Sequence, residues 1–179
     1  MAAEQREKRT LEYSLLGLLK GDPQHGYALF QKLQDTRELS RIWHVKRSKV
    51  YYLLEKLENQ GLLSSRVVPH DTYPDRKTYQ LTDQGRRCLQ EWVQQPVTSG
   101  RDMRVSFLSR LFFALQDSPA AARRLVKTQL AETRSWLTSL TGQWEELEDS
   151  DFLTDRTFQF RIGQVEAMLD WLRECRDQI

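Results

Sequence analysis

A cluster of cationic and hydroxyl side chains stands where one helical pattern begins. Lys46, Arg47, Ser48 and Lys49 come directly before and into a stretch whose apolar residues recur at helical spacing. Lysine and arginine bind phosphate oxygens or the edge of a guanine, and serine reaches a phosphate or a base. A solvated basic face is the commoner reason for such a cluster alone, so its meaning depends on the segments around it.

The helix that carries this cluster is predicted over residues 47–59. Val50, Leu53, Leu54 and Leu57 fall at i, i+3, i+4 and i+7 and form one buried stripe. A helix that enters the DNA major groove needs short or cationic residues at its N-terminal end, and this one has them. The candidate DNA-binding residues here are Lys46, Arg47, Ser48, Lys49, Tyr51, Tyr52 and Lys56.

A β-hairpin is predicted immediately after this helix. Gly61 is placed as a left-handed C-cap, residues 62–68 and 77–81 read as strands, and residues 69–75 as the turn. Arg76 and Lys77 are the candidate contacts of the hairpin to phosphate or the minor groove. Charge that protects an exposed sheet edge explains these two residues equally well.

Helices flank this unit on both sides. Residues 11–19 and 25–33 predict two helices before it, and Thr82 or Asp83 caps a helix that runs to about residue 95. The order of helix, helix, helix, hairpin and helix predicts a winged helix-turn-helix domain over residues 1–95.

The second half predicts only helices. Phe107, Leu108, Leu111, Phe112 and Leu115 mark the buried face of one, and Ser118-Pro119 begins the next. Apolar residues then recur in heptads along two long helices, with Thr133 as the polar exception in the first. An antiparallel hairpin covers one side of each helix, and a second subunit would cover the rest. The candidate dimerisation residues are Val126, Leu130, Leu137, Leu140, Trp144, Leu147, Phe158, Ile162, Val165, Leu169 and Leu172.

The predicted fold class is therefore mostly α with a small β-hairpin. A winged helix-turn-helix domain, residues 1–95, is followed by an all-α dimerisation domain, residues 103–179, with residues 96–102 as the linker. Net charge is only +2, but residues 1–95 hold 16 Lys and Arg against 12 Asp and Glu, and residues 96–179 hold 11 against 13. The basic excess lies with the winged helix.

Aromatic residues gather near the junction of the two predicted domains. Trp92, Phe107, Phe112, Phe113 and Trp136 either pack as core or line a cavity for a small, flat aromatic effector. The sequence leaves both interpretations open, with core packing the simpler one.

The sequence contains no recognised motif for catalysis or for metal binding. The chain has no phosphate-binding glycine loop, no nucleophile elbow and no zinc-protease signature, and its three histidines lack partners at metal-ligand spacing. We therefore expect no enzyme activity, no catalytic residue, no metal and no cofactor. Cys88 and Cys175 are predicted as core thiols. The absence of a signal peptide and of a membrane-length apolar run predicts a cytoplasmic protein that binds no membrane.

Three segments resemble the PadR family of bacterial regulators. They are LLGLLKGDPQHGYALFQKL near the N-terminus, VYYLLEKLENQGLL from Val50, and RKTYQLTDQG from Arg76. They occur in the family's order and cover about the first half of the chain. Tyr52 stands where the family usually has proline. The length after residue 103 is similar to that of the subfamily with a long C-terminal dimerisation region.

The resemblance implies a homodimer that represses transcription, with ligand release in some members. The leading hypothesis is a sequence-specific DNA-binding regulator, a repressor that binds a palindromic operator in double-stranded DNA as a homodimer and is released by a small aromatic ligand. The alternative is a winged helix that serves as a protein-interaction or scaffold module without binding DNA. A small helical enzyme without a readable motif is the weaker third possibility.

Overall fold

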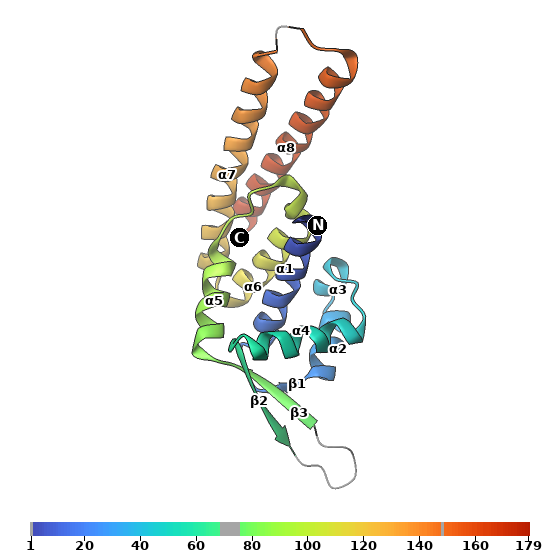
Figure 1. Cartoon of the computed structure of the whole chain (residues 1–179). Helices are drawn as coiled ribbons and strands as arrows, with labels where there is room; N and C mark the ends of the chain where they lie inside the picture. Colours follow the sequence, from blue (N-terminus) through green and yellow to red (C-terminus); the bar gives the residue numbers. More distant parts are fainter. Residues whose placement is uncertain (1, 69–75, 148) are drawn as a thin grey trace.

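The computed structural model describes residues 2–68, 76–147 and 149–179, and describes no side chain for residues 2–8, 68 and 76. The chain is mostly helical with one small antiparallel sheet, and Figure 1 shows the winged helix at one end and a long helical hairpin at the other. The elements of the first half are α1 (Ala2–Leu18), β1 (Gln24–His25), α2 (Gly26–Asp35), α3 (Leu39–Ile42), α4 (Arg47–Asn59), β2 (Leu63–Val68), β3 (Arg76–Leu81) and α5 (Asp83–Gln94).

The second half is helical, as predicted. A 3₁₀ turn at Gly100–Asp102 and a π-helical turn at Met103–Phe107 lead into α6 (Leu108–Asp117), α7 (Pro119–Glu145) and α8 (Phe152–Gln178). Among the described residues, no helix combines the length and the apolar character needed to cross a bilayer.

Local signals in the sequence determine α4 and its end. The predicted bounds are confirmed, and Val50, Leu53, Leu54 and Leu57 are buried as one stripe. Gly61 has a φ of 71°, in the left-handed region that favours glycine at a helix C-cap.

The sheet has three strands in the order β1-β3-β2, one more than the predicted hairpin. Leu63 pairs with Leu81 and Val68 with Arg76, so β2 and β3 form the wing, which we define as residues 63–68 and 76–81. The third strand, β1, pairs Gln24 with Tyr79. A strand of two residues is too short to show alternation, which explains why the sequence did not predict it. The predicted turn at residues 69–75 lies outside the described residues.

α1 lies at the centre of the molecule and packs on elements of both halves (Figure 1). Leu11, Leu15 and Leu16 of α1, and Leu19 just after it, are buried in a core that extends without a break to α8. A Cβ on Gly17 would lie 2.4 Å from the Phe113 ring, so α1 and α6 approach closely.

α6 differs from its predicted face in one residue. Phe107 and Leu111 are buried as expected, but Leu115 is 48% exposed, so its predicted burial was wrong. Phe113 is buried instead. Phe113 packs against Gly17 of α1 and the Trp92 ring of α5, partners that lie far from it along the chain.

The segment predicted as a linker is held firmly. Val97 is buried, its backbone N–H donates to Gln129 Oε1 at 2.8 Å, and Gln129 Nε2 donates to its carbonyl at 3.0 Å. The side chain of a buried glutamine therefore takes the place of a strand partner for this residue.

α7 and α8 form the antiparallel hairpin that the heptads predict (Figure 1). Ser118 caps α7 by accepting from Ala121 N–H, with Pro119 at its first position. Six of the predicted dimerisation residues are buried within the chain: Val126, Leu130, Leu140, Val165, Leu169 and Leu172. Leu137, Trp144, Phe158 and Ile162 are half-buried, and Leu147 is 40% exposed beyond the end of α7. The heptads therefore join the two helices of one chain.

Candidate nucleic-acid interface

The N-terminal end of α4 carries an exposed cationic surface. Lys46, Arg47, Ser48 and Lys49 are all exposed, and α4 begins after an extended Lys46 that has no side-chain cap. The first backbone N–H groups of the helix therefore point outward beside the cations. Such an end attracts anions through both the helix dipole and the side-chain charge.

Two tyrosines extend this surface along α4. Tyr52 is 52% exposed, and Lys49 Nζ lies 5.8 Å from the centre of its ring. Tyr51 is 41% exposed but also packs toward α2, because a Cβ on Gly26 would lie 2.9 Å from Tyr51 Cε1. Gly26 thus permits the close approach of α2 and α4, and Tyr51 has a packing role beside any contact with a ligand.

Lys56 is turned away from this surface. Its Nζ lies 2.6 Å from Glu12 Oε1 of α1, and the Glu12 side chain is only 10% exposed. The predicted DNA-binding residue therefore joins α4 to the central helix of the molecule. Lys56 lies outside the leucine stripe in the sequence, but a long side chain can reach around its own helix.

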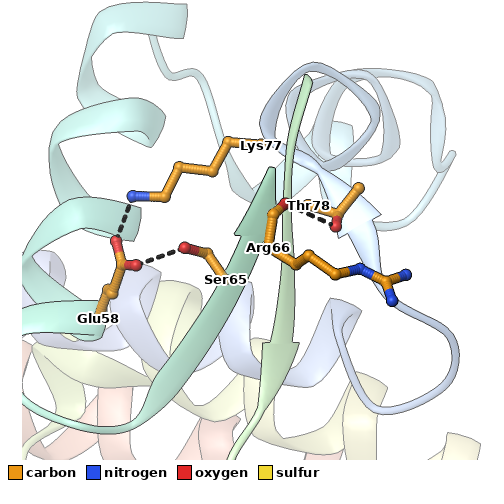
Figure 2. A network of polar contacts seen from close by, with 5 residues as sticks. All are labelled: Glu58, Ser65, Arg66, Lys77 and Thr78. Carbon is orange, nitrogen blue, oxygen red and sulfur yellow. Dashed lines mark hydrogen bonds and ion pairs between the residues drawn. The ribbon is translucent and has the colours of Figure 1, made fainter. Parts of the chain in front are cut away.

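Lys77 is also paired with a carboxylate. Its Nζ donates to Glu58 Oε2 at 2.6 Å, and Ser65 Oγ donates to Glu58 Oε1 (Figure 2). The hydrogen bonds from Lys77 and then Ser65 lower the pKa of Glu58, and the bond to Glu58 raises the pKa of Lys77. Both directions describe one well-matched ion pair. Arg76 belongs to β3, and its side chain lies outside the described residues.

The structure adds two exposed arginines that the sequence analysis did not select. Arg66 of β2 extends from the other side of the wing from Lys77 (Figure 2), and Arg41 lies on α3, just before α4. Strand alternation placed Arg66 and Ser65 on opposite faces, which was the available signal. Arg41 lies between the helices predicted at residues 25–33 and 47–59, where the sequence analysis predicts no element.

The predicted effector residues do not form one group. Phe113 contacts both Trp92, with ring centres 6.5 Å apart, and Phe112, with ring centres 5.0 Å apart. Phe107 is fully buried and meets Trp171 edge to face at 6.0 Å. Trp136 Nε1 donates to Glu132 on α7, facing a different groove.

Of these five, Trp92 lines a cavity of about 350 Å³ at the junction of α1, α5 and α6. Tyr13 stacks on Trp92 with ring centres 5.1 Å apart, and the Arg110 guanidinium lies 5.1 Å from the Trp92 ring centre. Thr10 and Ser106, joined by a hydroxyl hydrogen bond of 2.7 Å, also line it. The cavity therefore combines flat aromatic walls with hydroxyl groups.

Arg110 is one of four charged residues that line this cavity, with Arg9, Glu91 and Asp102. Its guanidinium donates to the carbonyls of Gln95 and Pro96 at 2.6 and 2.8 Å, while Nε is buried with no hydrogen-bond partner among the described residues. Burial lowers the pKa of Arg110 to about 10. A buried cation with unused donor capacity favours an anionic group nearby.

Comparison with known proteins finds two matching family regions in this chain. Residues 15–91 match the transcriptional regulator PadR-like family, and residues 103–179 match the virulence activator alpha C-terminal region. The negative transcriptional regulator PadR of Bacillus subtilis is 30% identical over 139 residues, which cover 78% of this chain and 75% of that protein.

A second relative, from Mycobacterium tuberculosis, is named a probable transcriptional regulator. It is 27% identical over 99 residues, 55% of this chain and 51% of that protein. Among solved structures, Bacillus subtilis PadR in complex with operator DNA is 26% identical, with a TM-score of 0.47, and the match covers 94% of this chain and 98% of that one.

Proposed function

The chain belongs to the PadR-like family of transcriptional regulators, and we propose that it is a sequence-specific DNA-binding repressor that acts as a homodimer on a palindromic operator. The observation that carries the proposal is the exposed N-terminal end of α4, with Lys46, Arg47, Ser48 and Lys49 beside free helix N–H groups. The chromosomal target implies a cytoplasmic location.

In this proposal α4 is the recognition helix. Its N-terminal end enters the major groove, where Arg47 and Lys49 bind phosphates or guanine edges and Ser48 reaches a base or phosphate. Tyr52 offers an exposed ring beside Lys49 for contact with the sugar-phosphate backbone or a thymine methyl group. Repression is proposed because the Bacillus subtilis relative is named a negative regulator.

Capture of genomic DNA by the purified full-length protein tests this function. Enriched fragments should share an inverted repeat whose half-sites lie about one helical turn, roughly 34 Å, apart. Binding should weaken steeply with salt because cations at each half-site displace counterions from the DNA. A protein that enriches no sequence, and whose association with DNA does not depend on salt, would instead be the interaction module.

We also propose that residues 103–179 form the dimerisation domain, with residues 96–102 as its boundary to the winged helix. Since the heptad seam is covered within the chain, a second copy would use the outer face of α8. Phe152, Leu153 and Phe160 are 78%, 72% and 67% exposed there, and Trp171 is 37% exposed. Free apolar groups of this size usually mark an interface.

The arrangement of this face suits a two-fold contact. Trp171, Met103 and Leu108 border an apolar groove of about 390 Å³, and Phe160 lies eleven residues before Trp171 on α8. Eleven residues make about three turns, so Phe160 projects from the same side roughly 16 Å away. A two-fold axis between them would seat the Phe160 of each copy in the groove of the other.

A small aromatic effector is the third part of the proposal. The junction cavity between Tyr13, Trp92 and Arg110 would stack a flat ring and pair a negative group with the guanidinium. Because α1 contacts both this cavity and α4, a ligand could change the separation of the two recognition helices. A tenfold loss of DNA affinity requires about 1.4 kcal/mol of preference for the non-binding arrangement.

Tryptophan fluorescence with a set of aromatic acids tests the effector. Binders should quench the wild-type signal, release DNA, and bind Arg110→Met at least about tenfold more weakly because a charge-assisted contact is lost. A compound that quenches at saturation and leaves DNA bound would refute the coupling. If no compound binds, Trp92 and its neighbours serve as core.

A further inference from the structure

Glu58, the penultimate residue of α4, holds both strands of the wing with one carboxylate. Lys77 of β3 donates to Oε2 at 2.6 Å, and Ser65 of β2 donates to Oε1 (Figure 2). Since Ser65 lies opposite Tyr79 and Lys77 opposite Val67, both groups project from the wing face that meets α4. One side chain thus ties the recognition helix to the wing at two points.

The ammonium group of Lys77 is engaged on the side that faces α4, although 43% of the side chain is exposed. Its ammonium pairs with Glu58, lies 5.4 Å from the ring centre of the buried Tyr79, and feels the charge of Glu55. Among the side chains described at this site, the two glutamates of α4 outweigh the one lysine. A phosphate that approached Lys77 here would meet a site with no excess positive charge.

Lys49 provides the contrast on the same helix. It is exposed, and no ion pair joins it to a carboxylate in the described part of the chain. Arg66 likewise extends away from Glu58, on the opposite side of the sheet (Figure 2). The cations that are free to meet DNA are thus different ones from Lys77.

We propose that Glu58 is a positioning residue for DNA recognition, which sets the wing against the recognition helix by holding Lys77 and Ser65, and that Lys77 supports DNA affinity through this attachment and not as a phosphate ligand. The proposal rests on the proposed function and names a residue of the opposite charge to the usual DNA contacts.

The decisive variant is Glu58→Gln, because the two roles of Lys77 predict opposite signs. If Lys77 is a phosphate ligand, removal of a competing carboxylate should strengthen operator binding. If Glu58 positions the wing, binding should weaken about threefold per half-site, or about tenfold for a dimer, as expected for loss of an exposed pair. Tighter binding by Glu58→Gln would overturn the proposal.

Ser65→Ala tests the attachment of the wing to Glu58 without any change of charge. It removes one of the two ties, so the positioning role predicts weaker binding at all salt concentrations with the same salt slope. A Ser65→Ala protein with wild-type affinity would show that the wing does not depend on this carboxylate.

Two double variants that keep the net charge test whether each lysine contacts DNA phosphate itself. The measurement is the salt slope, that is, the dependence of the logarithm of DNA affinity on the logarithm of salt concentration. Lys77→Met/Glu58→Gln should keep the salt slope of the wild type, whereas the matched control Lys49→Met/Glu55→Gln should lower it by about 0.9 per half-site. A loss of slope in the Lys77 variant equal to that in the control would make Lys77 a phosphate ligand and refute the proposal.

Hydrogen exchange without DNA measures the attachment itself. Amides of β2 and β3 should exchange faster in Glu58→Gln and in Ser65→Ala than in wild type, while those of α2 and α5 stay unchanged. Unchanged exchange in the wing would overturn the proposal even if both variants bind DNA more weakly. A wild-type protein that binds no operator would refute the proposed function, and the exchange result would still decide whether Glu58 holds the wing.

Discussion

Gly85→Ala should destabilise the junction of wing and α5 more than any other glycine-to-alanine change in a helix of the winged-helix half. Gly85 is buried in the first turn of α5, and its N–H donates to the capping Thr82 hydroxyl at 3.1 Å. Thr82 in turn donates to the Gly61 carbonyl and, through its backbone N–H, to the Leu62 carbonyl at 3.2 Å. The start of α5 is thus bonded to the turn that leads from α4 into the wing.

The structure provides the magnitude. A Cβ on Gly85 would lie 2.1 Å from Leu62 O and 3.1 Å from Leu62 C, and both are backbone atoms that cannot rotate away. Forced overpacking costs about 1–3 kcal/mol, and the strained Leu62 hydrogen bond about 1 kcal/mol more. Alanine regains about 1 kcal/mol of helix propensity, so the net loss should be about 1–3 kcal/mol.

Calorimetric melting of the full chain measures this loss. At about 2–4 °C per kcal/mol for a protein of this size, the melting temperature should fall by about 2–12 °C. Gly142→Ala on α7 and Gly163→Ala on α8 are matched controls, because no atom lies within 4 Å of their added methyl groups. Each control should gain up to about 1 kcal/mol. A Gly85→Ala protein that melts at or above the wild-type temperature would refute the packing argument.

Three further predictions address other contacts. Glu12→Gln should lower the free energy of unfolding in urea by about 1–3 kcal/mol because it leaves the Lys56 ammonium unpaired. The double variant Glu12→Gln/Lys56→Met should lose less, since no charge remains alone. Equal losses in the two variants would show that the pair contributes nothing specific. Phe160→Asp should shift the protein toward monomer in sedimentation, whereas the neighbouring Gln159→Asp should not. A Phe160→Asp protein that remains a dimer would show that the dimer uses another face. Because the pKa of Glu58 lies below 4.5, the stabilisation that its charge provides is complete above pH 4.5 and declines as pH falls through the lowered value. The difference in melting temperature between wild type and Glu58→Gln should therefore disappear in acid, and a difference that persists at pH 2 would contradict the ion pair.

Burial and capping explain which elements the sequence predicted well. The bounds of α4 follow from the stripe Val50, Leu53, Leu54 and Leu57 and from Gly61, and α7 begins at Ser118-Pro119 as predicted. These signals act within one or two turns of chain, so they are present in the sequence itself. The two-residue strand β1 and the π-helical turn before α6 carry no such local period and were missed.

The sequence could not predict which carboxylates pair with the charged residues of α4 and the wing. Lys56 and Lys77 had the residue type and helical or strand position expected of DNA contacts, yet Glu12 and Glu58 bind them. Glu12 is 44 residues from Lys56 along the chain, and Glu58 is 19 from Lys77. No local pattern encodes a contact between segments that far apart.

What the sequence by itself determined is the order of elements, the buried stripes and the exposed cationic start of α4, because helical period, caps and turns are properties of neighbouring residues. The tertiary structure alone decided which cations remain free for a ligand, that Trp92 joins Arg110 around a cavity while Trp136 does not, and that the heptads pair within one chain. Each of these depends on how α1, α4 and the wing, or α7 and α8, pack together, and the free energy of such packing is a property of surfaces that meet only after the chain has folded.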